Sequence, residues 1–288
     1  MKRICVPSDF STCAGYALDL AVLIAEKNKA EIHVLHSFNV NEGIISSDFS
    51  TPFQGVPGTM SAEQINSYVE EWLRSTKEQL ATIKKEVSGR GIKVETHMVE
   101  SGHFQGISEK IDELNGDLVV MGSHGSKGLE ERFIGSNTQR FIRHSEVPVL
   151  VTKQPPNGGK LYNVAFCSNF LHEGEKEVYH RFKHLFGKFP IHTHFLLVNT
   201  PSQFISTPVA QKRIDDFLMD TWPSNYDVHI YNDHSVDEGI MNFCEEKNID
   251  MLVLGTHGYT GIKRILRHSV TEGIVNHADI PVLTFCLE

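Results

Sequence analysis

The chain contains one short pattern twice, an apolar strand followed by glycines, and the spacing of the two copies constrains the fold. Leu118–Gly125 reads LVVMGSHG and Met251–Gly258 reads MLVLGTHG. Gly122 and Gly255 lie 133 residues apart, and the same spacing returns in the later VPVLV and IPVLT segments. A constant spacing over such a length indicates a tandem duplication, so the 288 residues divide into two similar halves.

The two halves differ in length near their middle. Aligning Asp9 with Asn169 gives a spacing of 160 residues, so the second half is 27 residues shorter than the first. We expect the loss to fall within Val40–Val87, because this stretch contains a loop rich in Gly, Ser and Pro, Val40–Met60, and then a polar helix from Ser61. A loop of this length is typical of a functional segment, such as a lid over a ligand or a contact with a partner.

Strand and helix patterns alternate through both halves. We expect strands at 4–6, 31–38, 92–99, 118–121, 147–152, 161–167, 194–198, 227–231, 251–254 and 280–285, and helices at 14–25, 61–87, 105–114, 135–144 and 236–247. Alternation of this kind predicts βαβ units and a parallel sheet. The segment 118–121 is apolar throughout, as expected of a strand that helices cover on both faces.

The boundary between the halves is marked by composition. Gln154–Gly159 reads QPPNGG, a sequence typical of a linker. We therefore predict a first domain at residues 1–153, a linker at 154–160 and a second domain at 161–288.

Composition excludes several classes of protein. The formal net charge of -9 and pI of 6.0 argue against a protein that grips the nucleic-acid backbone. No apolar run approaches the ~18 residues of a membrane span, and no signal peptide is expected at the start. The five cysteines are scattered and form no C-x-x-C pair, a usage that favours reduced thiols. We expect a cytoplasmic protein that contacts neither membrane nor nucleic acid.

The glycines after the fourth strand of the first half predict a phosphate site. Gly122 and Gly125 follow the strand, and Gly135 and Ser136 open the next helix. Backbone N–H groups of such a turn and of a helix start can hold a phosphate, provided that no side chain blocks them. In the second half, His268 stands in place of the late glycine, so one copy of the site looks complete and the other broken.

Two polar residues follow the other inner strands. Ligands of an open parallel sheet bind beyond the carboxyl ends of its strands, where the strand order reverses. Asp9 can accept hydrogen bonds from a ribose hydroxyl or a base amine, and the main chain around Ser37 can line a base pocket. The alternative for Asp9 is a helix cap, and the alternative for the glycines is a tight turn.

The spaced set Gly122, Gly125, Gly135 and Ser136 fits the pattern G-x2-G-x9-G-[ST], which resembles the ATP-binding signature of the universal stress protein family. The turn Pro7–Ser11 and the closing strand VPVLV are similar to that family too, and the resemblance covers both halves. It implies two tandem five-stranded parallel-sheet domains of α/β class, Rossmann-like and adenine nucleotide alpha hydrolase-like. It also implies that the last strands of the halves, 147–152 and 280–285, pair within the chain as a pseudo-dimer.

The resemblance further implies which residues contact ATP. Carried over position by position, they are Pro7, Ser8, Asp9, Ser37, Met121, Gly122, Gly125, Gly135, Ser136, Asn137 and Thr138. Ser37 and Asn137 stand where hydrophobic residues are common in the family, which puts the base contact in doubt. In the second half, Asn169 replaces the aspartate and His268 the glycine, so we expect that half not to bind ATP in the usual way.

The expected function is a stress-response binding or signalling module with an adenine nucleotide, ATP with or without Mg²⁺, in its first half. Lys127, Arg132, Arg140 and Arg143 flank the phosphate loop, either to neutralise a nucleotide or as solvated helix charges. No residue pattern defines a catalytic group, and His180, His184 and the pair His192-x-His194 lack zinc-motif spacing, so we expect no metal site. The alternatives are a slow ATPase or nucleotidyl-transfer enzyme, a scaffold without nucleotide, or a different small molecule in the second half. The protein partner and the formation of a homodimer stay open.

Overall fold

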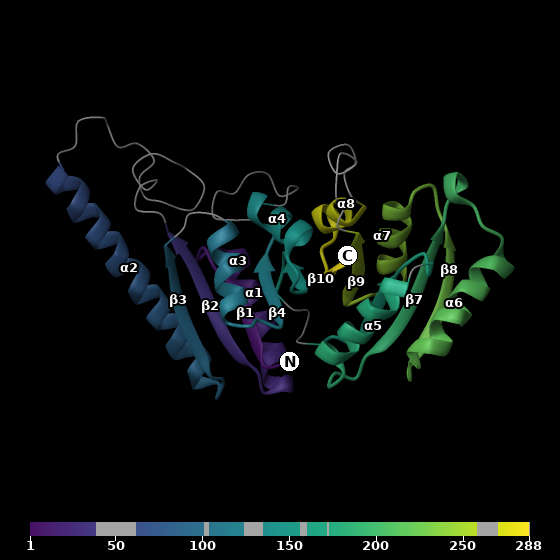
Figure 1. The fold of residues 1–288 in the computed structure, drawn as a ribbon, viewed down its shortest axis with the longest axis horizontal. Coiled ribbons are helices and arrows are strands. Elements are labelled where there is room, and N and C mark those ends of the chain that lie inside the picture. Colours follow the sequence, from purple (N-terminus) through teal and green to yellow (C-terminus); the bar gives the residue numbers. More distant parts are fainter. Residues whose placement is uncertain are drawn as a thin grey trace.

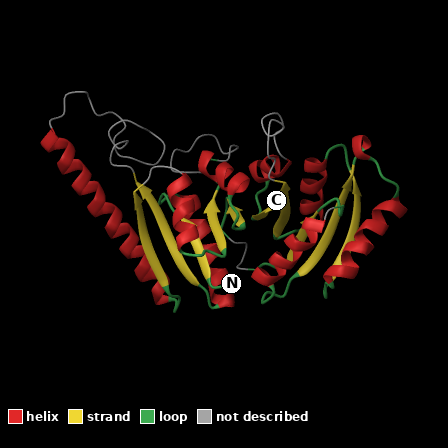
Figure 2. Cartoon of the chain, in the orientation of Figure 1, coloured by secondary structure: helices red, strands yellow, loops and turns green. Residues whose placement is uncertain are grey.

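A computed structural model describes residues 1–38, 62–100, 104–123, 135–155, 160–171, 173–257 and 270–287. These residues form a ten-stranded sheet with helices on both faces (Figures 1 and 2). The strands of the first half are β1 (Arg3–Pro7), β2 (Glu31–Phe38), β3 (Val94–Glu100), β4 (Leu118–Gly122) and β5 (Val149–Thr152). Those of the second half are β6 (Asn163–Cys167), β7 (His192–Asn199), β8 (Tyr226–Asn232), β9 (Met251–His257) and β10 (Val282–Leu287).

The strand order is β3-β2-β1-β4-β5-β10-β9-β6-β7-β8, so the second half repeats the first in reverse. Within each half all neighbouring strands are parallel, which confirms the predicted pair of five-stranded parallel sheets. The outermost strands, β3 and β8, lie at opposite ends of the molecule (Figure 1).

The halves join through β5 and β10, which pair antiparallel. Leu150 lies opposite Leu283, its own counterpart at the 133-residue spacing, so a pseudo-twofold axis passes between these two side chains. Both leucines are fully buried. The predicted pseudo-dimer is therefore confirmed, and the pairing also satisfies two strand edges that would otherwise be exposed.

The helices divide between the two faces of the sheet. One face is covered by α1 (Thr12–Asn28), α2 (Ala62–Gly89), α5 (Glu173–Phe186) and α6 (Thr207–Thr221), and the other by α3 (Phe104–Glu113), α4 (Ser136–His144), α7 (Val236–Lys247) and α8 (Val270–His277). Each face has its own hydrophobic cluster, and each cluster contains residues of both halves. The core is thus continuous across the pseudo-twofold axis.

The difference in length between the halves lies where the spacing predicted it. α2 has 28 residues and α6, its counterpart, has 15. The residues before α2, including the proposed lid Val40–Met60, lie outside the described part of the chain. α2 runs along β3 at the outer edge of the first half (Figure 1).

One local prediction is wrong. The pattern suggested a glycine-rich turn from Gly255, but β9 continues as a strand to His257. Gly255 and His257 stay in register with Phe285 and Leu287 of β10. Because β10 is long enough to pair with these residues, the backbone stays extended there, whereas β4 ends at Gly122.

Candidate functional site

The candidate site lies at the carboxyl edge of the first half, between β1 and β4. From β1 the chain adds β2 and β3 on one side, and then β4 and β5 on the other, so the strand order reverses between β1 and β4. Loops at such a switch point diverge and leave room for a ligand. Segments from the ends of β1, β2 and β4 and from the start of α4 come together at this edge (Figure 1).

The turn after β1 is held to the end of β2. The Ser8 N–H donates to the Leu35 carbonyl over 2.9 Å, and His36 Nδ1 donates to the Ser8 carbonyl over 2.8 Å. Phe10 has a φ of 62° and stacks on His36 with ring centroids 4.5 Å apart. Burial lowers the pKa of His36, so its imidazole is neutral at neutral pH and keeps the Nδ1 proton for Ser8. Sequence reasoning missed His36 and Phe10, whose role depends on contact between two strands.

Asp9 contributes to this turn without being the helix cap. Its Oδ1 accepts a 3.0 Å hydrogen bond from the Ser11 N–H, and its side chain is largely buried. The N-cap of α1 is Ser11, whose Oγ accepts from the Ala14 N–H. In the second half, Asn169 Oδ1 accepts from the Leu171 N–H at 3.1 Å in the same way. An amide oxygen can therefore accept the same hydrogen bond of the turn as the Asp9 carboxylate.

Ser37 carries the one buried side-chain oxygen or nitrogen that has no hydrogen-bond partner within the described residues. Only 4% of the residue is exposed. A buried hydroxyl without a partner costs about 1–3 kcal/mol. Val198 takes the equivalent place in the second half, on the strand β7, and packs closely against Gly239 of α7. The first half thus keeps a costly polar group where the second half has a methyl-bearing side chain.

Two hydrogen bonds join the end of β4 to the start of α4, and a third joins the end of β4 to the end of β5. Thr138 Oγ1 donates to the Gly122 carbonyl over 3.1 Å, the Gly135 N–H donates to the Ser123 carbonyl over 2.8 Å, and the Ser123 N–H donates to the Thr152 carbonyl over 3.0 Å. The Thr138 hydroxyl and the Gly135 amide therefore serve the framework. The N–H groups left for a phosphate are those of the next residues, Ser136 and Asn137.

The N-cap of α4 has no side chain. The N-cap residue is Gly135, so the N-cap supplies no side-chain acceptor for the first turn. The first N–H groups of an α-helix have no partner within the helix, and together with the helix dipole they favour an anion. α4 thus presents amide groups at the switch point with no side-chain oxygen of its N-cap competing for them.

Gly122 is required for packing. A Cβ atom on Gly122 would lie 2.7–2.9 Å from the backbone carbon, the Cβ and the carbonyl oxygen of Cys13. The first turn of α1 therefore lies directly against the end of β4. The sequence suggested that residue 122 is a glycine because a phosphate needs access to the backbone. The packing against Cys13 is a second reason for a glycine at this position. A larger residue here would shift α1 whether or not a ligand is bound.

The structure brings most of the expected ATP contacts to this one edge. Pro7, Ser8 and Asp9 follow β1, Ser37 ends β2, Met121 and Gly122 end β4, and Gly135, Ser136, Asn137 and Thr138 begin α4. The Met121 side chain is buried in the core, so only its backbone is available to a ligand. Gly125, His124, Lys127, Arg132 and His268 lie outside the described residues.

Arg143 does not serve the phosphate site. Its guanidinium forms a two-pronged ion pair with the carboxylate of Glu272 in the second half, with Nη2 2.6 Å from Oε2. This hydrogen bond raises the pKa of Arg143. Glu272 is buried, so the arginine neutralises an acid at the junction of the halves. Neither earlier interpretation, a phosphate contact or a solvated charge, describes it.

The fold defines a class: a tandem, doubly wound α/β protein with a switch point at the carboxyl edge of the sheet in each half. The sequence profile described as the Universal stress protein family matches residues 1–153 and 226–285. The chain belongs to the universal stress protein family. Within the described residues, no helix is long and apolar enough to cross a membrane.

Similar proteins include chains of one and of two halves. Universal stress protein MJ0531 of Methanocaldococcus jannaschii is 32% identical over 154 residues, which cover 54% of this chain and 83% of that protein. Universal stress protein Slr1230 of Synechocystis is 23% identical over 305 residues, covering 99% and 100%. A solved universal stress protein of Archaeoglobus fulgidus aligns with a TM-score of 0.74 at 18% identity, covering 99% and 96% of the chains.

Proposed function

We propose that the first half binds ATP, or a related adenine nucleotide, and that the protein is a stress-response binding or signalling module controlled by this occupancy. The observation that carries the proposal is the uncapped start of α4, which Thr138 fastens to the end of β4 at the switch point. The phosphates would lie on the amides of Ser136 and Asn137. Mg²⁺ would accompany ATP as the counter-ion of its phosphates.

The nucleoside would lie toward β1 and β2. Asp9 supplies a carboxylate that its turn does not need, and a carboxylate is a good acceptor for ribose hydroxyls. The Ser37 hydroxyl supplies a buried group that a base could satisfy. Gly125 would complete the phosphate loop, and Pro7, Ser8, Met121 and Gly122 would contribute backbone.

The second half is proposed as a partner of the first that does not bind ATP in the same way. Its turn after β6 keeps the same geometry, but Asn169 replaces the charge, Val198 replaces the hydroxyl and β9 continues through the glycine. We also keep the division into residues 1–153, 154–160 and 161–288, and a cytoplasmic location, as proposals.

The experiment that tests the proposal counts nucleotide. The freshly purified protein is denatured, and released nucleotide is identified and quantified by chromatography and mass spectrometry. We expect about one ATP per chain, and none from Gly135→His, which reproduces the second-half residue. Gly135 has a φ of -59°, so a histidine there is not strained by the backbone.

The matched pair is Asp9→Asn and Asn169→Asp. Asp9→Asn keeps the turn and removes only the charge, so ATP affinity should fall by about tenfold to a hundredfold, the worth of a hydrogen bond to a charged group. Asn169→Asp should leave affinity unchanged. Two ATP per chain would overturn the assignment of the second half, and bound ADP would favour the slow ATPase. No nucleotide, and no binding when ATP and Mg²⁺ are added, would overturn the proposal itself.

A further inference from the structure

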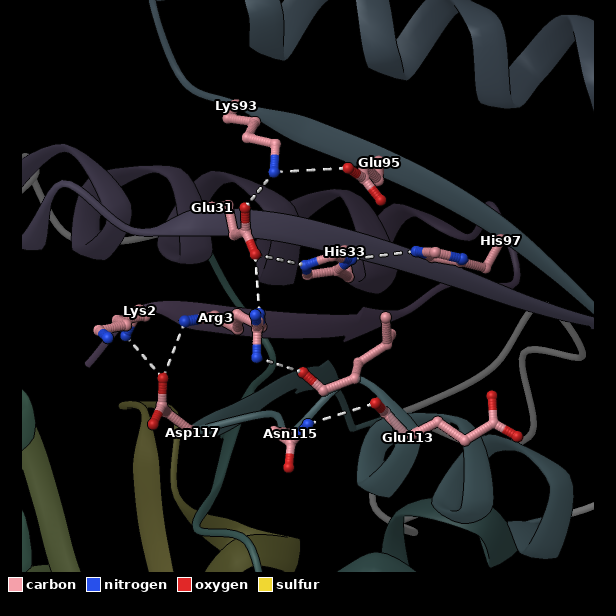
Figure 3. A network of polar contacts seen from close by, with 11 residues as sticks. Lys2, Arg3, Glu31, His33, Lys93, Glu95, His97, Glu113, Asn115 and Asp117 are labelled. Carbon is pink, nitrogen blue, oxygen red and sulfur yellow. Dashed lines mark hydrogen bonds and ion pairs between the residues drawn. The ribbon is translucent and has the colours of Figure 1, made fainter.

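Two histidine clusters lie at equivalent places in the two halves, on the outer strands of each sheet. In the first half, His33 of β2 is in register with Glu95 of β3. Nδ1 of His33 lies 3.0 Å from Nε2 of His97, and the two rings are stacked. Figure 3 shows this cluster together with the charged residues beside it.

The first-half cluster is neutralised by the chain's own cations. Glu31 accepts hydrogen bonds from Arg3 at 2.8 Å, Lys93 at 2.6 Å and His33 at 3.2 Å (Figure 3). The Lys93 and Arg3 hydrogen bonds lower the pKa of Glu31 to about 2. Lys93 also lies 3.5 Å from Glu95. Both acids of this region therefore already have a positive partner.

The second half repeats the histidine pair. His194 of β7 is in register with Asp227 of β8, and its Nδ1 lies 3.1 Å from Nε2 of His229. The ring centroids of this pair are 5.3 Å apart, the same separation as in the first half. Two pairs of the same geometry at equivalent positions show that the duplication preserved the arrangement.

The residues around the second pair have changed in a consistent direction. The two cations and the acid between them are replaced by two amides and a third histidine: Asn163 takes the place of Arg3, Asn225 that of Lys93 and His192 that of Glu31. Asp227 remains as the acid. Within the described residues no lysine or arginine forms an ion pair with it, and the nearby Lys247 pairs with Glu246. This cluster has lost its internal cations.

The hydrogen bonds of His192 fix which ring nitrogen carries its proton. Asn225 donates its Nδ2 to the Ile191 carbonyl, so its Oδ1 is the atom that faces His192 Nδ1 at 2.9 Å. Nδ1 is then the donor, and Nε2 is the atom that faces Oδ2 of Asp227, 2.9 Å away. A metal ion bound to both atoms would take the place of the proton that an imidazolium would share with the carboxylate.

We propose that His192, His194 and Asp227 form a binding site for a divalent transition metal of the zinc class. One ligand atom from each of the three residues lies within 4.8 Å of the others. Zinc bonds to nitrogen and oxygen ligands are about 2.0–2.2 Å long, which places tetrahedral ligands about 3.3 Å apart. The Asp227 side chain is 59% exposed, so it can rotate and bring the separations between the ligand atoms to the tetrahedral value. Water can take the fourth position.

The surroundings of the three ligands are those of a metal site. A ligating histidine commonly donates its second ring N–H to a carbonyl or carboxylate, as His192 does to Asn225. The two ring nitrogens of His194 face His229 at 3.1 Å and Asn163 at 3.4 Å, so coordination of a metal would replace one of these contacts.

The proposed metal would link the edge strand β8 to β7. In the first half, Lys93 of the β2–β3 edge performs the equivalent task by bridging Glu31 and Glu95. An external cation in one half thus replaces an internal cation in the other. The inference is independent of nucleotide binding, because the cluster lies on the outer strands of the half that is not proposed to bind ATP.

The test uses the full chain, stripped with a chelator and dialysed against buffered Zn²⁺, with bound metal counted by mass spectrometry. Co²⁺ serves as a second probe, since its visible absorption reports tetrahedral nitrogen and oxygen ligands. The variants are His192→Asn and Asp227→Asn. The control is His180→Gln, an exposed histidine on α5. Thermal unfolding with and without Zn²⁺ confirms that each variant is folded and measures how much bound Zn²⁺ stabilises the folded state.

We expect one Zn²⁺ per chain at micromolar free metal, a higher unfolding temperature in its presence, and at least tenfold weaker binding in both variants but not in the control. Zinc that stays bound in His192→Asn and Asp227→Asn would overturn the site, as would no binding at micromolar metal. Two Zn²⁺ per chain, one of them lost in the variants, would support the site and would show that the first-half cluster binds metal beside its own cations.

Discussion

The two halves of the molecule share a framework and differ in charge. Both have the same five-stranded order, the same turn after the first strand and a histidine pair with ring centroids 5.3 Å apart. The first half adds Asp9 at the ligand edge and an ion network at the outer edge, and the second half has amides in both places. Duplication therefore preserved the groups that shape the backbone and changed those that bind other charges.

The largest expected effect tests whether the halves form one folding unit. Leu150 and Leu283 are fully buried and lie opposite each other on the pseudo-twofold axis. Leu150→Ala and Leu283→Ala should each lower the free energy of unfolding by about 2–5 kcal/mol. Because the core is continuous, urea unfolding monitored through Trp72 of the first half and by the far-ultraviolet circular dichroism of the whole chain should show one transition. Separate transitions for the two signals would contradict this.

The next prediction removes an ion pair that is present on only one side of the pseudo-twofold axis. Arg143 pairs with the buried Glu272, while the equivalent positions on the other side of the axis hold Asn276 and Gln139. Arg143→Met removes the cation from a buried carboxylate and should cost about 1–3 kcal/mol, less than for a fully buried pair because the Arg143 side chain is 48% exposed. The double variant Arg143→Met/Glu272→Gln should recover most of that loss in chemical denaturation. A single variant as stable as the wild type would show that the pair is dispensable.

A smaller effect is expected when the lysine of the first-half cluster is introduced at the equivalent position of the second half. Asn225→Lys places the first-half lysine beside His192 and Asp227, where its ammonium would compete with a metal. Zinc affinity should fall about tenfold or more, within the range found when groups beside metal ligands are altered. Asn248→Lys, at the C-cap of α7, is the control for added charge. Undiminished zinc binding in Asn225→Lys would contradict the proposal that zinc binds at this cluster.

The sequence predicted the framework well because the framework repeats. The constant 133-residue spacing identified the duplication, and the resemblance to the universal stress protein family implied the pairing of the last strands, which the structure contains. The boundary that failed, at Gly255, depended on how far β10 extends beside it, which no local pattern contains. For the same reason the packing role of Gly122 was missed beside the two predicted roles, phosphate access and a tight turn, since its contact with Cys13 joins segments more than a hundred residues apart.

The metal cluster shows the same limit of sequence reasoning. The prediction of no metal site depended on spacing along the chain, and Asp227 lies far in sequence from the histidine pair His192 and His194. Strand register brings them together. His184, which had attracted attention on its helix, lies 3.1 Å from the amino-terminal nitrogen instead. A comparison of the two halves position by position would have revealed the exchange of Lys93 for Asn225.

The smallest effect tests the ion network of the first half by pH. Because Lys93 and Arg3 lower the pKa of Glu31 from 4.5 to about 2, the folded state binds a proton here less readily than the unfolded chain. The stabilisation is therefore complete above the unfolded pKa and is lost as the pH falls from 4.5 toward 2. Glu31→Gln should lower the thermal midpoint by roughly 1–3 °C at pH 7, since Lys93 is largely exposed.

This difference between Glu31→Gln and the wild type should shrink on acidification, and it should be nearly absent near pH 2. Glu113→Gln, which removes an exposed ion pair within α3, is the matched control and should show little change at either pH. A difference that persists unchanged at low pH would mean that Glu31 acts through packing and not through its charge. The first half would then lack the internal cation bridge that distinguishes it from the second, and its histidine pair would become a second candidate for metal.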